Sequence, residues 1–189
     1  MGIHITGVGS YIPSHKERNQ DFLAHTFLDD GGNPFGAENG DIIEKFKAIT
    51  GIEERRYAKP HQTASDLAFL AAEKAIEDAS LDPETLDYII VAHNFGDIQH
   101  GCIQTDILPS LATRVKHNLQ IKNPNCVAYD LIFGCPGWVE GVIQAQAFIK
   151  SGMAKRCMVI GADTLSRIAD QNDRDAMIFA DGAGATIIE

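Results

Sequence analysis

The stretch DLIFGCPGW, residues 130–138, decides the fold because it joins a buried strand to a helix through a tight turn. Residues 126–131 form a short apolar run after an Asn-Pro-Asn cluster, which predicts a buried strand. Residues 138–150 carry apolar side chains at helical spacing, and Pro136 suits the first helical position. We therefore expect Cys135 between two glycines at the start of a helix.

The position of Cys135 has a chemical consequence. Unpaired N–H groups and the positive dipole end at a helix start favour a thiolate, which is the form that attacks acyl groups. Cys102, Cys126 and Cys157 form no C-x-x-C pair or Cys/His metal spacing with it. Cys126 and Cys157 lie in apolar runs, where cysteine behaves as a small hydrophobe. The sequence predicts reduced cysteines, one working thiol at Cys135 and no metal site.

Outward from this stretch, apolar runs alternate with segments of helical periodicity. The expected strands are residues 3–8, 88–92, 126–131, 157–161 and 183–188, and the short apolar run at 176–180 is expected to form a closing strand pair with the last of them. The expected helices are residues 42–49, a helix from the capping box at Thr63 to Ala79, 106–119 and 138–150. This order predicts an α/β fold in which a five-stranded, mixed, mostly parallel sheet has helices on both faces.

Charge and hydropathy exclude some classes of function. The formal net charge is -10, from 16 basic and 26 acidic side chains, which disfavours nucleic acid as a partner. Hydrophobic residues make up 44% of the chain, but no apolar run is long enough to cross a bilayer. The first residues do not form a signal peptide. We expect a cytoplasmic protein that acts neither on nucleic acid nor in a membrane.

Several short motifs, taken together and in order, resemble the β-ketoacyl-acyl-carrier-protein synthase III family of the thiolase superfamily. They are TGIEERR at 50–56, TASDLA at 63–68, the nucleophile turn at 130–137, GADTLSR at 161–167, Asp173-Arg174, and FADGAGA at 179–185. The turn departs from the usual A-C-x-G, since it reads Gly134-Cys135-Pro136-Gly137.

The resemblance implies a thiolase-like fold of two similar halves, of which residues 1–189 are the N-terminal half-domain and the C-terminal half is absent. The family's catalytic His and Asn are then expected beyond Glu189, so this fragment alone should be inactive. The missing half should leave an apolar face exposed.

The implied activity is that of an acyltransferase of fatty acid biosynthesis, a decarboxylating condensing enzyme. Cys135 would take an acyl primer as a thioester, and malonyl-carrier protein would extend it to a 3-oxoacyl-carrier protein. No cofactor is implied beyond coenzyme A or carrier-protein thioesters as substrates. The alternatives are Cys-dependent acyl transfer to an alcohol or amine, and a non-catalytic partner subunit, which the retained Cys135 argues against.

The resemblance also implies binding residues. Arg174 matches an arginine beside the coenzyme A adenine, although a solvent-facing salt bridge is an equal alternative for it. Lys45 stands where the best-known members have the stacking tryptophan, and Ile49 replaces a nearby basic residue. Residues 27–40 and 93–105 are longer than usual. The primer can therefore come on coenzyme A or on an acyl carrier protein.

Two further expectations concern assembly and loops. The family pairs as homodimers, and Leu108 is expected to close the partner subunit's acyl pocket. His93 and His100 are interpreted as hydrogen-bonded or solvated loop histidines. The glycines of Asp181–Gly184 are expected to permit a tight turn beside the site, because a phosphate loop would need a Gly-Lys-Ser/Thr ending.

Overall fold

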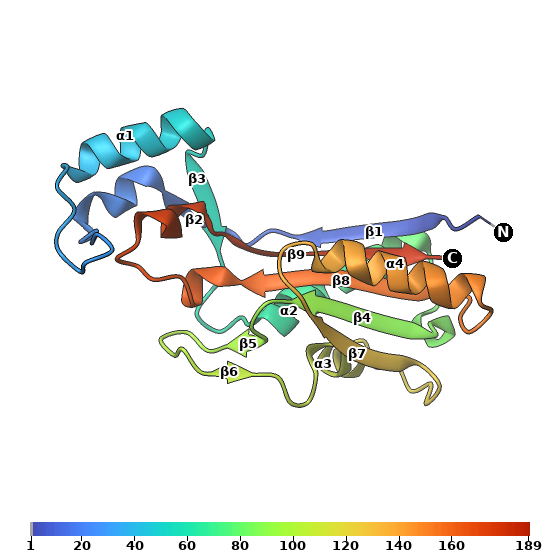
Figure 1. Cartoon of the computed structure of the whole chain (residues 1–189). Coiled ribbons are helices and arrows are strands. Elements are labelled where there is room, and N and C mark those ends of the chain that lie inside the picture. The colour runs from blue at the N-terminus through green and yellow to red at the C-terminus, as the bar shows by residue number, and fades with distance from the viewer. Residues whose placement is uncertain (1) are drawn as a thin grey trace.

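A computed structural model describes residues 2–189 and consists of a five-stranded sheet with helices on both faces (Figure 1). The strand order is β1 (Ile5–Tyr11), β9 (Asp181–Ile188), β8 (Cys157–Thr164), β4 (Tyr88–His93) and β7 (Val127–Ile132). β7, β4 and β8 are parallel, and β9 runs antiparallel to both β8 and β1. The predicted mixed, mostly parallel sheet is confirmed, with β9 as its reversed strand.

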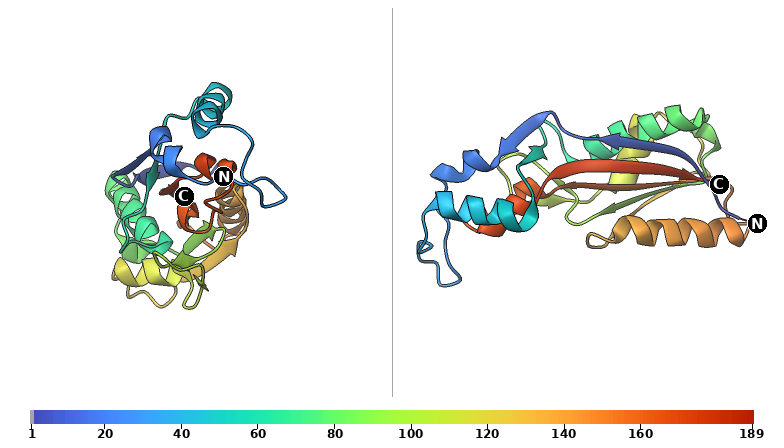
Figure 2. Two further views of the ribbon diagram at one scale, coloured as in Figure 1. Left: turned by 90° about the vertical axis from the view of Figure 1, so that its left-hand side faces the viewer. Right: turned by 90° about the horizontal axis from the view of Figure 1, so that it is seen from above.

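Three helices cover the sheet (Figure 2). α2 (Ala64–Ala79) and α3 (Leu111–Asn118) lie on one face, and α4 (Gly137–Lys150) lies on the other. α2 begins at the predicted capping box, where the Thr63 backbone N–H donates to the Asp66 carboxylate at 2.8 Å. Alanines of α2 are fully buried against the sheet, as the stripe of small side chains predicts.

A smaller lobe projects from the end of the sheet opposite the two chain termini (Figure 1). It contains β2 (His15–Arg18), β3 (Glu54–Tyr57), α1 (Asn39–Thr50) and two 3-10 helices, η1 (Asn19–Ala24) and η4 (Arg174–Ile178). Its own core is Phe22, Phe27, Ile42 and Met177. The remaining elements are η2 (Pro83–Thr85), η3 (Leu165–Arg167) and the hairpin of β5 (Asp97–Ile98) and β6 (Thr105–Asp106).

Two expected elements differ in the structure. The helix expected over 106–119 begins only at Leu111, because the Ser110 hydroxyl caps it by accepting from the Thr113 N–H, while Asp106 pairs in β6. The apolar run at 176–180 is no strand: most of it lies in η4, which Asp173 caps by accepting from the Asp175 N–H at 2.9 Å. Neither cap could be predicted from the periodicity of apolar residues alone.

The glycines after Asp181 also differ from expectation. They lie inside β9, in register with β8 and β1, so they form no tight turn. They do lie beside the predicted site, since Gly182 lines the same pocket as Cys135.

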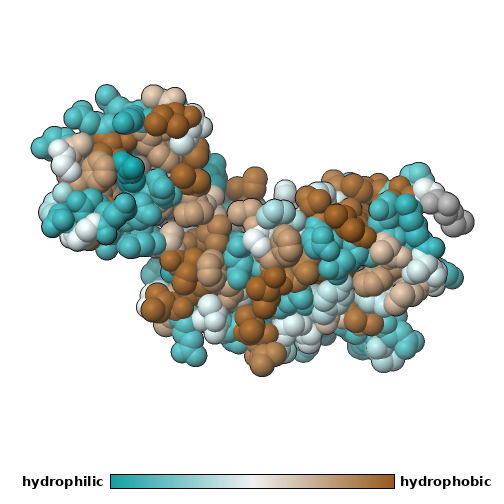
Figure 3. Space-filling view, viewed as in Figure 1, coloured by the Kyte–Doolittle hydropathy of each residue, from teal (hydrophilic) through white to brown (hydrophobic). Residues whose placement is uncertain are grey.

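One flank of α4 is left uncovered. The helix buries Gly137, Gly141 and Ala145 toward β4 and β8, while Val139 and Ile143 are each 52% exposed. Figure 3 shows hydrophobic side chains gathered over α4 and the sheet beside it. Contiguous exposed apolar surface of this kind marks a face that contacts another part of a protein.

Membrane crossing can be assessed from the helices. Within residues 2–189, none of them combines the length and the apolar character that a bilayer span requires.

Candidate active site

Cys135 lies in a pocket of about 190 Å³ at the carboxyl edge of the three parallel strands. The ends of β4, β7 and β8 meet at this edge, where ligands of open α/β sheets usually bind. The pocket is lined by Ala92, His93, Phe133, Gly134, Cys135, Gly137, Trp138, Gly161, Ala162, Asp163, Ala180 and Gly182. The position expected for Cys135 is therefore the one observed.

The backbone around Cys135 is a tight turn. The Gly137 N–H donates to the Gly134 carbonyl at 2.8 Å, and Pro136 occupies the N-cap of α4, one position earlier than expected. Cys135 is exposed, and its backbone N–H donates no hydrogen bond within residues 2–189. An accessible thiol beside free N–H groups at a helix start is an arrangement that can hold an acyl oxyanion.

Glycines let α4 approach the sheet closely enough to hold this turn. A Cβ at Gly137 would lie 3.0 Å from the Ala92 Cβ, and one at Gly141 would lie 2.7 Å from a Val159 methyl carbon. Because Gly137 and Gly141 have no side chain, α4 can pack close to the sheet. This close packing sets the position of Cys135 at the ends of the strands.

His93 also lines the pocket but is held in one tautomer. The Gly96 N–H donates to Nδ1 at 2.9 Å, so the ring proton is on Nε2, which lies 3.1 Å from the Asp130 carboxylate. The ring is buried, and both of its nitrogens are occupied. His93 is thus hydrogen-bonded as predicted, although it ends β4 and does not lie in a loop, and it is not available as a base for Cys135.

Asp130 ties this edge of the sheet to α3. Its two carboxylate oxygens accept from the backbone N–H groups of Leu111 and Ala112 at 2.7 and 2.8 Å, in addition to His93. A carboxylate is favoured at this position because it faces the positive end of the helix. The sequence did not reveal this role, since Asp130 lies 19 residues from Leu111.

We expect Asp130→Asn to lower the free energy of unfolding by about 1–3 kcal/mol. Donors face both oxygens of Asp130, so an amide NH₂ group must meet at least one of them. Urea unfolding measures the change, and Asp30→Asn, at an exposed aspartate, is the matched control. Equal stability of the two variants would contradict this role for Asp130.

The carboxylate that lines the Cys135 pocket is that of Asp163, which was not singled out from the sequence. Asp163, near the end of β8, accepts from the backbone and side-chain amides of Asn94 at 2.9 and 2.7 Å. Burial raises the pKa of Asp163, while the Asn94 hydrogen bonds act in the opposite direction. The available signal was a polar residue at the carboxyl end of a parallel strand.

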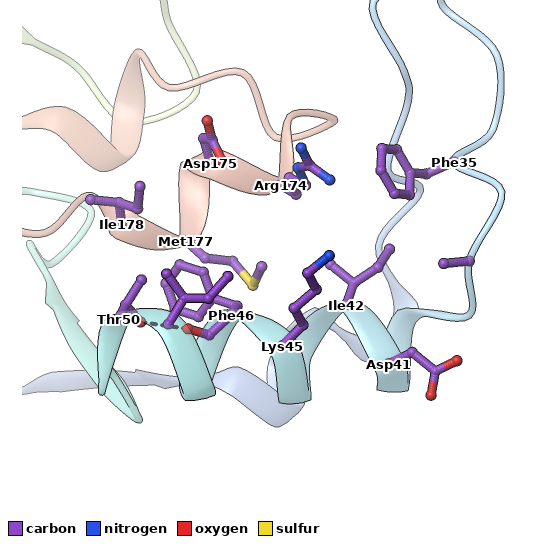
Figure 4. A pocket seen from close by; sticks show the side chains of 12 residues that line it. Phe35, Asp41, Ile42, Lys45, Phe46, Thr50, Arg174, Asp175, Met177 and Ile178 are labelled. Atoms are coloured by element: carbon purple, nitrogen blue, oxygen red, sulfur yellow. Dashed lines mark hydrogen bonds between the residues drawn. The ribbon is translucent and has the colours of Figure 1, made fainter.

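Arg174 lies in a separate cleft of about 520 Å³ between α1 and η4. Figure 4 shows Lys45 and Arg174 on opposite walls, with the Met177 side chain beside Lys45. The Arg174 guanidinium lies 4.6 Å from the centre of the Phe35 ring. Neither cation forms an ion pair in the part of the chain that the structure describes, so the salt bridge considered for Arg174 is not found.

The candidate residues are not all brought together. Ile178 lines the Arg174 cleft, and Ala180, two residues later, lines the Cys135 pocket. The two sites are therefore neighbours along one segment of the chain. Leu108 lines neither of them and is 81% exposed. Across residues 2–189, no group of three or more His, Cys, Asp or Glu side chains could hold a metal ion.

Comparison with known proteins agrees with this geometry. Residues 129–189, which include the Cys135 turn, match the family model of 3-oxoacyl-[acyl-carrier-protein (ACP)] synthase III. The β-ketoacyl-[acyl-carrier-protein] synthase III of Neisseria meningitidis is 40% identical over 185 residues, which are 97% of this chain and 51% of that protein. This chain is similar in sequence to β-ketoacyl-acyl-carrier-protein synthase III over about half the length of that protein.

Solved structures of synthase III are similar to this chain in fold. The 3-oxoacyl-[acyl-carrier-protein] synthase III of Aquifex aeolicus superposes with a TM-score of 0.79 at 33% identity, covering 99% of this chain and 53% of its own. A 3-oxoacyl-(acyl-carrier protein) synthase from Burkholderia xenovorans gives 0.82 at 25% identity, covering 100% and 48%. The chain thus spans about half the length of the synthase III relatives that it matches.

Proposed function

We propose that this chain forms the acyl-accepting part of a condensing enzyme that makes a 3-oxoacyl-carrier protein from an acyl primer and malonyl-carrier protein. The observation that carries the proposal is the exposed Cys135 thiol in the pocket at the start of α4. The relatives' names supply the reaction class, since they are β-ketoacyl-acyl-carrier-protein synthases III.

In the proposed reaction the Cys135 thiolate attacks the carbonyl carbon of the primer thioester. A new sulfur–carbon bond forms, the donor's sulfur–carbon bond breaks, and the donor thiol leaves with a proton. Malonyl-carrier protein then loses CO₂, and its carbanion attacks the acyl group on Cys135 and releases the thiol. The Cys135 N–H, which is free within residues 2–189, would donate to the oxyanion in both steps.

The thioester arm of the substrate would pass through the cleft that contains Arg174 and Lys45. This cleft combines two cations that form no ion pair within residues 2–189 with an apolar floor that includes Ile42 and Met177, which suits a phosphate-bearing apolar arm. Either coenzyme A or an acyl carrier protein could deliver that arm, and no other cofactor is proposed. We place the protein in the cytoplasm, where its four free cysteines stay reduced.

Incubation with acetyl-coenzyme A and with an acetyl-carrier protein tests the proposal. Peptide mass spectrometry is expected to find a slowly formed acetyl adduct on Cys135, and none in Cys135→Ser. Condensation with malonyl thioesters by these 189 residues alone should be absent, because His93, the histidine that lines the pocket, is engaged at both nitrogens. Adducts spread over other side chains would contradict the proposed role.

We also propose that two copies pair along β7, with Leu108 reaching the partner subunit. β7 is an edge strand of the sheet, and an open edge offers unpaired N–H and C=O groups to another strand. Ile132 and Phe133, at its end, are 61% and 46% exposed. Leu108 is also exposed, and it shortly precedes α3 in the chain. Because Asp130 of β7 holds the start of α3, Leu108 lies near this edge of the sheet.

Ile132→Lys is expected to convert the dimer to a monomer in sedimentation equilibrium. A charge at each copy's edge repels its counterpart and must be desolvated when the strands pair. Ile49→Lys is the matched control, since Ile49 is 74% exposed on α1, away from β7. An unchanged mass for Ile132→Lys would show that β7 is not the interface.

A further inference from the structure

A cleft outside the two sites above has a volume of about 820 Å³. Its walls come from four segments that are apart in the sequence: residues 14–15 at the start of β2, residues 57–60 at the end of β3, residues 100–103 at the tip of the β5–β6 hairpin, and residues 166–171 after β8. No residue lines both this cleft and the Cys135 pocket. We call it the hairpin cleft.

Arg167 holds the walls of the hairpin cleft together. Its guanidinium donates to the Ile98 carbonyl and, at 2.9 Å, to the Lys59 carbonyl, so it joins the hairpin to the segment after β3. Because a guanidinium has five N–H donors, these two bonds leave others free for a ligand. The cleft is therefore formed before any ligand enters it, which lowers the cost of binding.

The charges around the hairpin cleft are basic. Lys59, Arg167 and His100 line it, and no Asp or Glu side chain does so. The ammonium group of Lys59 has no ion pair or hydrogen bond among residues 2–189. A fourth basic residue, His15, is within 3.3 Å of the Glu17 carboxylate and is not counted as free.

Of the carboxylates that act on Arg167, that of Asp181 has the largest effect, and it is already occupied. Asp181 is buried and accepts from the Ala58 N–H and from the N–H and hydroxyl of Ser166, at 2.7 to 2.9 Å. The Asp181 carboxylate is therefore directed toward these donors in the wall of the hairpin cleft. By contrast, the Cys135 pocket and the Arg174 cleft each include at least one carboxylate in their lining. In a chain with a net charge of -10, a cleft lined by bases alone is selective for anions.

The rest of the lining is suited to an apolar body. Pro60, Ile103 and the ring of Tyr57 lie in the same cleft, and its volume is within the usual range for small-molecule sites. Tyr57 stays protonated as a possible hydrogen-bond donor, since burial raises its pKa to about 12. We propose that the hairpin cleft binds a small organic anion, with a phosphate or carboxylate head at Lys59 and Arg167 and an apolar body against Ile103.

Cys102 provides a reporter inside the hairpin cleft, because it is exposed and lines the wall, whereas Cys135 is an exposed thiol in the other pocket. Phenyl phosphate and phenylacetate are expected to slow alkylation of Cys102 by about threefold or more at saturation, and to leave Cys135 unchanged. Benzyl alcohol, which has the apolar body without the charge, should have no effect. The more protective of the two anions identifies the head group.

Lys59→Gln is expected to weaken binding about two- to fivefold, as is usual for an exposed charge, and Lys155→Gln, elsewhere on the surface, should leave it unchanged. Arg167→Lys, with its fold checked by circular dichroism, should weaken binding more. Equal slowing of Cys102 and Cys135, or equal binding by Lys59→Gln and the parent chain, would overturn the proposal. If Cys102 were protected only when the sedimentation mass doubled, a second copy of the chain would be covering the cleft. That result would also overturn the proposal.

Discussion

Iodoacetamide is expected to modify Cys135 at least ~100-fold faster than Cys157 at pH 8. Burial raises the pKa of the Cys157 thiol to about 12 and also raises that of Cys126. A thiol with a pKa of about 12 is ionised to roughly one part in ten thousand at pH 8, and only the thiolate reacts. Cys135 is exposed at the start of α4, so neither burial nor the sheet protects it.

Cys102 separates accessibility from the effect of the helix. It is exposed like Cys135 but lies in a hairpin, without a helix start beside it. The dipole contributes below ~1 kcal/mol at an exposed site, so Cys135 should react no more than about fivefold faster than Cys102. Timed alkylation followed by peptide mass spectrometry gives all four rates at once. Modification spread evenly over the four cysteines would remove the case for a special thiol at position 135.

The parts of the fold that could be predicted are those with local signals. The strand, turn and helix around Cys135 follow from an apolar run, two glycines and a proline within nine residues. The start of α2 follows from the capping box at Thr63, and the end of α1 from Gly51, whose φ of 71° suits glycine. Each of these signals acts within one or two turns of chain.

The parts that could not be predicted depend on partners distant in the sequence. Asn94 and Asp163 meet through hydrogen bonds across 69 residues, because β4 and β8 are neighbours in the sheet. Apolar periodicity gives the strands but not their order, so it could not pair these residues or place Asp163 in the Cys135 pocket. For the same reason it read the run at 176–180 as a strand, although η4 packs Met177 into the core of the smaller lobe.

Functional residues were likewise predictable only where one residue and the segment around it are enough to indicate the chemistry. Cys135 could be recognised because its turn is continuous in sequence. Arg174 was identified by resemblance, but its contact with Phe35 depends on a loop whose course the sequence does not specify. The hairpin cleft had no sequence signal at all, because its basic residues come from four separate segments.

Gly9→Ala is expected to destabilise the chain by about 3 kcal/mol or more. β1 lies so close to α2 that a Cβ at Gly9 would be 2.2 Å from the Ala71 carbonyl oxygen and 2.4 Å from the Ala75 nitrogen. Both are backbone atoms of a buried helix, so no side-chain rotation relieves the contact. The helix and the strand must separate, and the alanines packed between them lose contacts.

Gly184→Ala is the matched control, because it makes the same chemical change in β9, the strand paired with β1. A Cβ at Gly184 meets no atom within 4 Å, and the residue does not need a positive φ. Alanine also restricts the unfolded chain, so this variant should be neutral or slightly more stable. Thermal unfolding of the two variants therefore isolates the spacing between β1 and α2. If Gly9→Ala unfolded at the same temperature as Gly184→Ala, that spacing would not be set by the glycine, and the close packing of α2 on the sheet would need another cause.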